Sequence, residues 1–111
     1  MADVLGGFEQ AVLLAVIRLR DEAYGRAILK EAETRLERAV AAGAVHATLD
    51  RLEQKGLVTS RLGTGTPVRD GRARRYYSVS AEGVRALNNA RTMIDKLWHG
   101  LDWPLKGSRA R

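Results

Sequence analysis

Residues 43–58, in the middle of the chain, read GAVHATLDRLEQKGLV and carry the clearest information about the fold. Val45, Leu49 and Leu52 recur at helical spacing, which predicts a helix over residues 43–55 with one apolar face. Gly56 supplies the C-terminal stop. The opposite face carries small or polar residues, namely Gly43, His46, Ala47, Asp50, Arg51 and Gln54. Because the residues at its N-terminus are small, this helix can approach another surface closely.

After Gly56 the apolar pattern changes from the helical period to alternation, which predicts strands over residues 57–62 and 73–79. In the second strand, one face carries Arg75, Tyr77 and Val79, and the other carries Arg74, Tyr76 and Ser78. Asp70-Gly71 favours a turn in the segment between the strands. We therefore expect a long hairpin with a basic tip.

Two further helices are expected before this unit. Residues 8–19 are apolar on nearly every side, which is typical of a helix buried in the centre of a domain. Residues 24–37 form an amphipathic pattern that predicts the second helix. Residues 38–40 are a short extended connection at best.

The last helix begins after Ser80, a suitable N-cap, with Glu82 in its first turn. One heptad-like stripe contains Val84, Leu87, Ile94, Trp98 and Leu101, interrupted by Arg91, and a second contains Ala86, Ala90, Met93 and Leu97. Two stripes exceed what packing on one small domain needs, so we expect a partner subunit. The alternative is that both stripes face the chain's own core. Residues 105–111 are expected to be a flexible basic tail.

The charge of the chain is concentrated in one segment. The 111 residues carry 19 Lys and Arg against 13 Asp and Glu, a net charge of +6. Residues 61–76 contain five arginines and only one acid, Asp70. This surplus points to a polyanionic partner, although a solvated loop is the alternative.

Several classes of protein are excluded by composition. The chain has no cysteine, so it holds neither a disulfide nor a thiolate zinc site. His46 and His99 have no carboxylate at metal-ligand spacing, and no nucleophile–base pair is evident. We expect no metal, no cofactor, no enzymatic activity and no membrane contact. No basic segment of a signal peptide begins the chain, which favours a cytoplasmic location.

Three helices followed by a basic hairpin form the order of a winged helix-turn-helix. The fold class is therefore mainly α with a small β-hairpin, comprising a DNA-binding domain over residues 1–80 and a C-terminal dimerisation helix over residues 81–104. A helix fits the major groove of double-stranded DNA, and an arginine-rich wing reaches the backbone or the minor groove. The alternative function is a protein–protein interaction module whose basic wing binds an acidic partner.

Four segments together resemble the PadR-like transcriptional regulators. They are residues 43–58, the Ala23-Tyr24-Gly25 start of the second helix, Gly71-Arg-Ala-Arg-Arg-Tyr-Tyr-Ser-Val-Ser-Ala-Glu-Gly83 at the wing and last helix, and Leu5-Gly-Gly-Phe-Glu9 before the buried helix. The resemblance implies a homodimeric regulator, usually a repressor, that binds a pseudo-palindromic operator and in some members responds to a flat aromatic molecule. The single C-terminal helix is similar to the compact subgroup. The chain departs from the family at His46, where tyrosine is common, and at Ala42, where a capping serine or threonine is common.

The expected DNA-binding residues are Tyr24, Gly43, His46, Ala47, Arg51, Arg69, Arg72, Arg74 and Arg75. For four of these residues an alternative role stays open. His46 would be a surface histidine without a contact, Tyr24 a half-buried packing residue, Arg51 a partner of Glu53, and Arg75 a structural residue. The expected dimer interface consists of Val84, Leu87, Arg91, Ile94, Trp98 and Leu101. Trp98 either stacks on an aromatic effector or only packs this interface.

Overall fold

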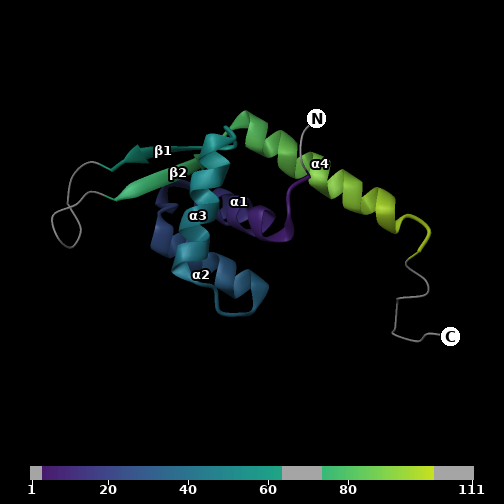
Figure 1. The fold of residues 1–111 in the computed structure, drawn as a ribbon, viewed down its shortest axis with the longest axis horizontal. Coiled ribbons are helices and arrows are strands. Elements are labelled where there is room, and N and C mark those ends of the chain that lie inside the picture. The colour runs from purple at the N-terminus through teal and green to yellow at the C-terminus, as the bar shows by residue number, and fades with distance from the viewer. Residues whose placement is uncertain (1–3, 64–73, 102–111) are drawn as a thin grey trace.

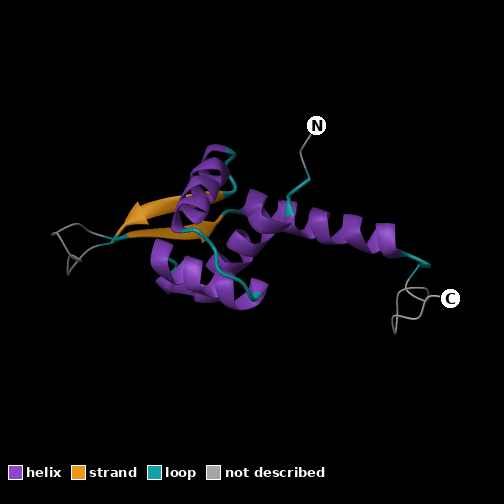
Figure 2. Ribbon diagram, turned by 60° about the horizontal axis from the view of Figure 1, so that its bottom comes forward, coloured by secondary structure: helices purple, strands orange, loops and turns teal. Residues whose placement is uncertain are grey.

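The computed structural model describes residues 4–63 and 74–101 (Figure 1). Its elements follow in the order α1 (Gly7–Leu19), the short 3-10 helix η1 (Arg20–Glu22), α2 (Gly25–Leu36), α3 (Ala42–Gln54), β1 (Val58–Leu62), β2 (Arg75–Val79) and α4 (Ala81–Trp98). This order confirms the expected fold class, a mainly helical chain with one hairpin. The hairpin lies at one end of the molecule and α4 extends toward the other (Figure 2).

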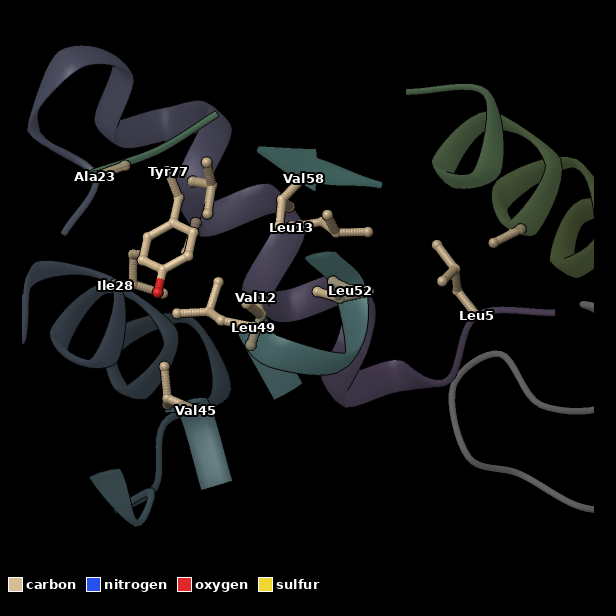
Figure 3. Packing of buried hydrophobic residues seen from close by; sticks show 13 residues of the cluster. Leu5, Val12, Leu13, Ala23, Ile28, Val45, Leu49, Leu52, Val58 and Tyr77 are labelled. Carbon is tan, nitrogen blue, oxygen red and sulfur yellow. The ribbon is translucent and has the colours of Figure 1, made fainter. Parts of the chain in front are cut away.

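The core is built around α1. Val12, Leu13 and Val16 are buried on it, and side chains from α2, α3 and the hairpin close over them (Figure 3). Leu5 extends the buried cluster toward α4. The prediction that α1 is buried all round was wrong in one respect, because Leu14 and Ile17 are each 44% exposed. The described chain covers that side of the helix only in part.

The apolar face predicted for α3 is confirmed. Val45, Leu49 and Leu52 are buried, together with Thr48. The helix begins at Ala42, one residue earlier than expected, and its N-cap Ala41 provides no side-chain hydrogen bond. Gly56 ends the turn after α3 with φ of 79°, a left-handed conformation that a residue without a Cβ adopts at little cost.

The hairpin strands are antiparallel, with Arg61 opposite Tyr76 and Leu62 opposite Arg75. Both strands are shorter than predicted. The segment before α2 also pairs with β2. Tyr24 forms an isolated bridge with Tyr76, and the Tyr77 N–H donates to the Ala23 carbonyl at 2.8 Å. The hairpin is thereby attached to the N-terminus of α2.

The first turn of α4 packs closely on the rest of the domain. The Ser80 hydroxyl accepts from the Gly83 N–H at 3.0 Å and donates to the Gly56 carbonyl at 2.7 Å, which confirms the predicted cap. Ala90 is buried, and Ala86 and Leu87 are half-buried against the core. Residues 91–98 are all exposed, and this half of α4 projects away from the body of the domain (Figure 1).

The alternative that both stripes of α4 face the chain's own core is wrong for part of the helix, and the expected partner subunit stays a prediction. The core covers Ala86, Leu87 and Ala90, but Val84, Met93, Ile94, Leu97 and Trp98 are exposed. The helix ends at Trp98, so Leu101 follows it in the loop, and residues 102–111 lie outside the described part. None of the helices that the structure describes has the length and apolar character needed to cross a membrane.

Candidate nucleic-acid interface

A groove of about 990 Å³ runs between the start of α2, the start of α3 and the start of β2. Five of the expected DNA-binding residues line it: Tyr24, Gly43, His46, Arg74 and Arg75. They come from three parts of the chain, the starts of α2, α3 and β2, and the bridge between Tyr24 and Tyr76 joins the first of these to the last. The structure therefore places these residues on one surface.

The outer face of α3 is largely free of bulky side chains near its N-terminus. Ala42, Gly43, Ala44 and Ala47 are all exposed, and His46 is the one large side chain among them. The His46 side chain is 74% exposed, with its Nε2 3.8 Å from the Asp50 carboxylate. An uncapped helix N-terminus with small residues leaves backbone N–H groups accessible to an anion.

Further along α3, Arg51 does not pair with Glu53 as the alternative supposed. Its guanidinium donates to the Thr48 hydroxyl at 3.3 Å, and the side chain remains exposed on the same face as Ala47. Glu53 instead accepts a hydrogen bond from the Ser60 hydroxyl at 2.7 Å. Arg51 is thus available on the outer face, although it does not line the groove.

The two arginines at the start of β2 have different environments. Arg75 donates from Nη1 to the Ser60 hydroxyl at 3.0 Å, and through Ser60 it connects β2 with Glu53 on α3. Arg74 lies on the other face of the strand, with its guanidinium carbon 4.0 Å from the centre of the Tyr24 ring. The predicted division of the strand into two faces is confirmed. Arg69 and Arg72 lie outside the described residues.

Three cationic side chains on this surface were not among the expected DNA-binding residues. Arg26 and Lys30 line the groove from α2, and Arg61 lies over the Tyr76 ring at 4.9 Å. The available signal was the i, i+4 spacing of Arg26 and Lys30 directly after Tyr24-Gly25. With Arg74 and Arg75, the groove holds four cations against one acid, Glu33. Such a surface attracts a polyanion.

The far end of α3 is fixed to α1. Lys55 Nζ lies 3.3 Å from a carboxylate oxygen of Glu9, whose other oxygen accepts from the Gly6 N–H at 3.0 Å. Burial raises the pKa of Glu9, but the hydrogen bonds from Gly6 and Lys55, with the charges of Lys55 and Arg51, outweigh burial and leave the pKa lowered. These contacts hold α3 in a fixed orientation relative to the core.

Tyr77 supports the floor of the groove. It is buried among residues of α2 and α3 (Figure 3), and burial raises the pKa of its phenol above the ordinary value. A neutral phenol at this position lets β2 pack directly against the helices. No cluster of metal-ligating side chains occurs among residues 4–63 and 74–101.

The residues predicted for a dimer interface lie on α4 or just after it. Val84, Ile94, Trp98 and Leu101 are exposed, Leu87 is half-buried, and Arg91 is exposed without an ion pair to Asp95. Trp98 is 50% exposed at the end of the projecting half of α4. The core of the described chain covers part of Leu87, while Val84, Ile94, Trp98 and Leu101 stay exposed.

Comparison with known proteins agrees with this architecture. The model of the transcriptional regulator PadR-like family matches residues 13–89, more than half of the chain. A PadR family transcriptional regulator from Eggerthella lenta is 28% identical, with a TM-score of 0.64 over 86% of this chain and 81% of that one. A PadR family transcription regulator from Clostridium difficile is 26% identical, with a TM-score of 0.61 over 83% of this chain and 95% of that one.

RosR from H. salinarum is also similar, with 25% identity and a TM-score of 0.67 over 90% of this chain and 83% of that one. No curated protein matches the chain significantly. Together with the winged-helix fold and the cationic groove, the match over residues 13–89 shows that the chain belongs to the PadR-like family of transcriptional regulators and is a DNA-binding protein, not an enzyme.

Proposed function

We propose that this regulator is a cytoplasmic homodimeric repressor that binds a pseudo-palindromic operator. The observation that carries the proposal is the groove, where four cationic side chains from α2 and β2 flank the small-residue N-terminus of α3. The cations supply affinity for phosphates, and α3 supplies sequence reading.

In this proposal α3 enters the major groove with its N-terminal half. The small side chains of Ala42, Gly43 and Ala47 allow its backbone to come close to the base edges. His46 and Arg51 then remain as the side chains long enough to reach bases or adjacent phosphates. Arg69 and Arg72, on the wing, are proposed to contact the backbone or the minor groove.

The second copy is proposed to pack on α4. Val84, Ile94 and Trp98 are exposed apolar residues on a helix whose second half projects from its own domain. Burial of this surface against a partner would favour association. A two-fold axis at α4 would place two α3 helices on successive turns of the duplex, about 34–36 Å apart.

The effector is proposed to be a flat aromatic molecule that stacks on Trp98. The half-exposed indole at the proposed two-fold interface supports this assignment, because paired tryptophans from two copies would form a stacking site. Binding there would alter the angle between the two DNA-binding domains. Repression would be relieved if that angle no longer matched the operator.

Selection from random DNA duplexes, with and without planar aromatic compounds, tests the operator and the effector together. We expect enrichment of an inverted repeat and a lower affinity when an effector is present. The logarithm of the binding constant should fall linearly with the logarithm of the salt concentration, with a slope of about −0.9 per phosphate neutralised. Equal binding to all sequences would contradict the operator proposal.

The dimer is tested separately by replacing Ile94 with glutamate, using Asn88→Glu as the matched control on an exposed polar position of the same helix. We expect Ile94→Glu to sediment as a monomer, because a charge would replace an apolar side chain at the interface. Asn88→Glu should remain a dimer. If both variants sediment as dimers, the part of α4 around Ile94 does not form the dimer interface.

A further inference from the structure

Two tyrosines and two arginines meet where the hairpin joins α2. The rings of Tyr24 and Tyr76 are in edge-to-face contact, with centroids 5.8 Å apart and planes inclined at 71°. The Arg74 guanidinium lies 4.0 Å from the centre of the Tyr24 ring, and the Arg61 guanidinium lies 4.9 Å from that of Tyr76. We call these four residues the tyrosine platform. In this platform each guanidinium group lies over one ring of the tyrosine pair.

The strand register explains why the four side chains meet. Arg61 is paired directly with Tyr76, so both side chains point to the same face of the hairpin. Arg74 precedes Tyr76 by two residues and shares that face. Tyr24 reaches the same face through its backbone bridge to Tyr76. Arg75 points to the opposite face and belongs to the separate contact with Ser60.

Gly63 makes room for the platform. A Cβ at this position would lie 2.7 Å from Cε1 of Tyr76 and 3.3 Å from the Arg74 carbonyl oxygen. The Gly63 N–H also donates to that carbonyl at 2.6 Å, so the strands remain paired up to the arginine. The absence of a side chain at residue 63 therefore lets the Tyr76 ring lie against the backbone beside Arg74.

Arginine positioned in this way keeps its donors available. A guanidinium can lie on an aromatic face and still direct N–H groups toward a phosphate, because its donors lie at the edge of the plane. Neither Arg61 nor Arg74 forms a salt bridge with an acid in residues 4–63 and 74–101. Since a free arginine loses much rotamer freedom on binding, prior restriction by a ring reduces the entropic cost of phosphate contact.

We infer that Tyr24 and Tyr76 are positioning residues for DNA binding, whose rings hold Arg74 and Arg61 so that both engage one stretch of sugar–phosphate backbone beside the start of α2. This inference rests on the proposed DNA-binding groove and deepens it. It assigns to the Tyr24 ring the role of holding Arg74, in place of a direct hydrogen bond from the Tyr24 hydroxyl to DNA.

The test is a double-mutant cycle on Tyr24 and Arg74, read by fluorescence anisotropy with a mixed-sequence DNA duplex at low salt. Tyr24→Leu removes the ring, and Tyr24→Phe keeps the ring but removes the hydroxyl. We expect Tyr24→Leu to weaken binding about two- to fivefold, the range of an exposed cation–π contact, and Tyr24→Phe to bind as the wild type does. In the Arg74→Ala background, Tyr24→Leu should cause no further loss.

Two results would overturn the inference while leaving the DNA-binding groove intact. One is an equal loss in Tyr24→Phe and Tyr24→Leu, which would assign the contact to the hydroxyl. The other is a double variant that loses the sum of both single effects, since independent residues add. Failure of the wild type to bind any duplex would instead overturn the proposed function itself.

Folding of each variant is checked by circular dichroism, because Tyr24 is half-buried. If Tyr24→Leu does not fold, Tyr24→Trp takes its place, since indole is the strongest cation–π partner. We then expect affinity at or above that of the wild type. If folded Tyr24→Trp and Tyr24→Phe both lose affinity by the same factor, the Tyr24 hydroxyl makes the contact and the inference is overturned.

Discussion

Replacing Gly83 with alanine tests how closely α4 packs on the rest of the domain. A Cβ at residue 83 would lie 2.3 Å from the Leu57 carbonyl oxygen and 2.6 Å from Cγ1 of Val79. The Leu57 carbonyl cannot easily move, because it already accepts a hydrogen bond from the Ser80 N–H at 3.0 Å. Ordinary contacts begin at 3.4 Å, so the helix and the turn would have to separate by about 1 Å.

The size of the effect follows from two opposing contributions. Alanine favours the helix over glycine by up to about 1 kcal/mol. Overpacking against atoms that cannot yield costs about 1–3 kcal/mol, and contact with backbone places this site at the upper end. We therefore expect the free energy of unfolding to fall by about 2 kcal/mol, and the melting temperature by roughly 10 °C.

The assay is urea and thermal unfolding of both proteins at one fixed concentration, since association makes the apparent stability depend on concentration. Gly7→Ala is the matched control, because Gly7 also lies in the first turn of a helix and a Cβ added there would meet no atom within 4 Å. We expect this control to be neutral or slightly stabilised. If Gly83→Ala is as stable as Gly7→Ala, the close packing of α4 is not as described.

Three further changes probe the cap, the anchor of α3 and the wing. Ser80→Ala removes the α4 cap and leaves the Gly56 carbonyl without its donor, so the free energy of unfolding in urea should fall by about 1–2 kcal/mol. Glu9 has a lowered pKa, so its stabilising contribution is present above the ordinary value of 4.5 and is lost as pH falls through the lowered pKa. The free energy of unfolding should therefore fall less for Glu9→Gln than for the wild type when the pH is lowered from neutral to acid. Urea unfolding of both proteins across that pH range measures the difference. Arg75→Ala should weaken DNA binding in anisotropy less than Arg74→Ala does, because Arg75 is engaged within the protein; equal losses would contradict that assignment.

Much of the fold follows from patterns that are local in the chain. The spacing of Val45, Leu49 and Leu52 requires one buried face, and the structure buries it. The alternation of Arg74 and Arg75 assigns them to opposite faces before any partner is known. The Ser80 cap involves residues only a few positions apart. Each of these features depends on backbone geometry within one element.

The parts that were predicted incorrectly, or that stay predictions, depend on what lies opposite an element. Leu14 and Ile17 are as apolar as their buried neighbours, yet the described chain leaves each of them 44% exposed. On α4, Leu87 and Ile94 belong to one stripe, but only Leu87 lies near the core. Periodicity identifies an apolar face and does not say whether the same chain or a second copy covers it.

The order of the elements, the outward face of α3 and the concentration of arginine around the hairpin could be predicted from the sequence alone, because these depend on local propensity and composition. The folded chain was needed to show that Tyr24 lies beside Tyr76, that Arg26 and Lys30 join Arg74 in one groove, and that a Cβ at residue 83 would collide with the Leu57 carbonyl. Those contacts join residues far apart in the chain. They are fixed by how the whole core packs, so the types of side chain and their spacing along the chain do not reveal them.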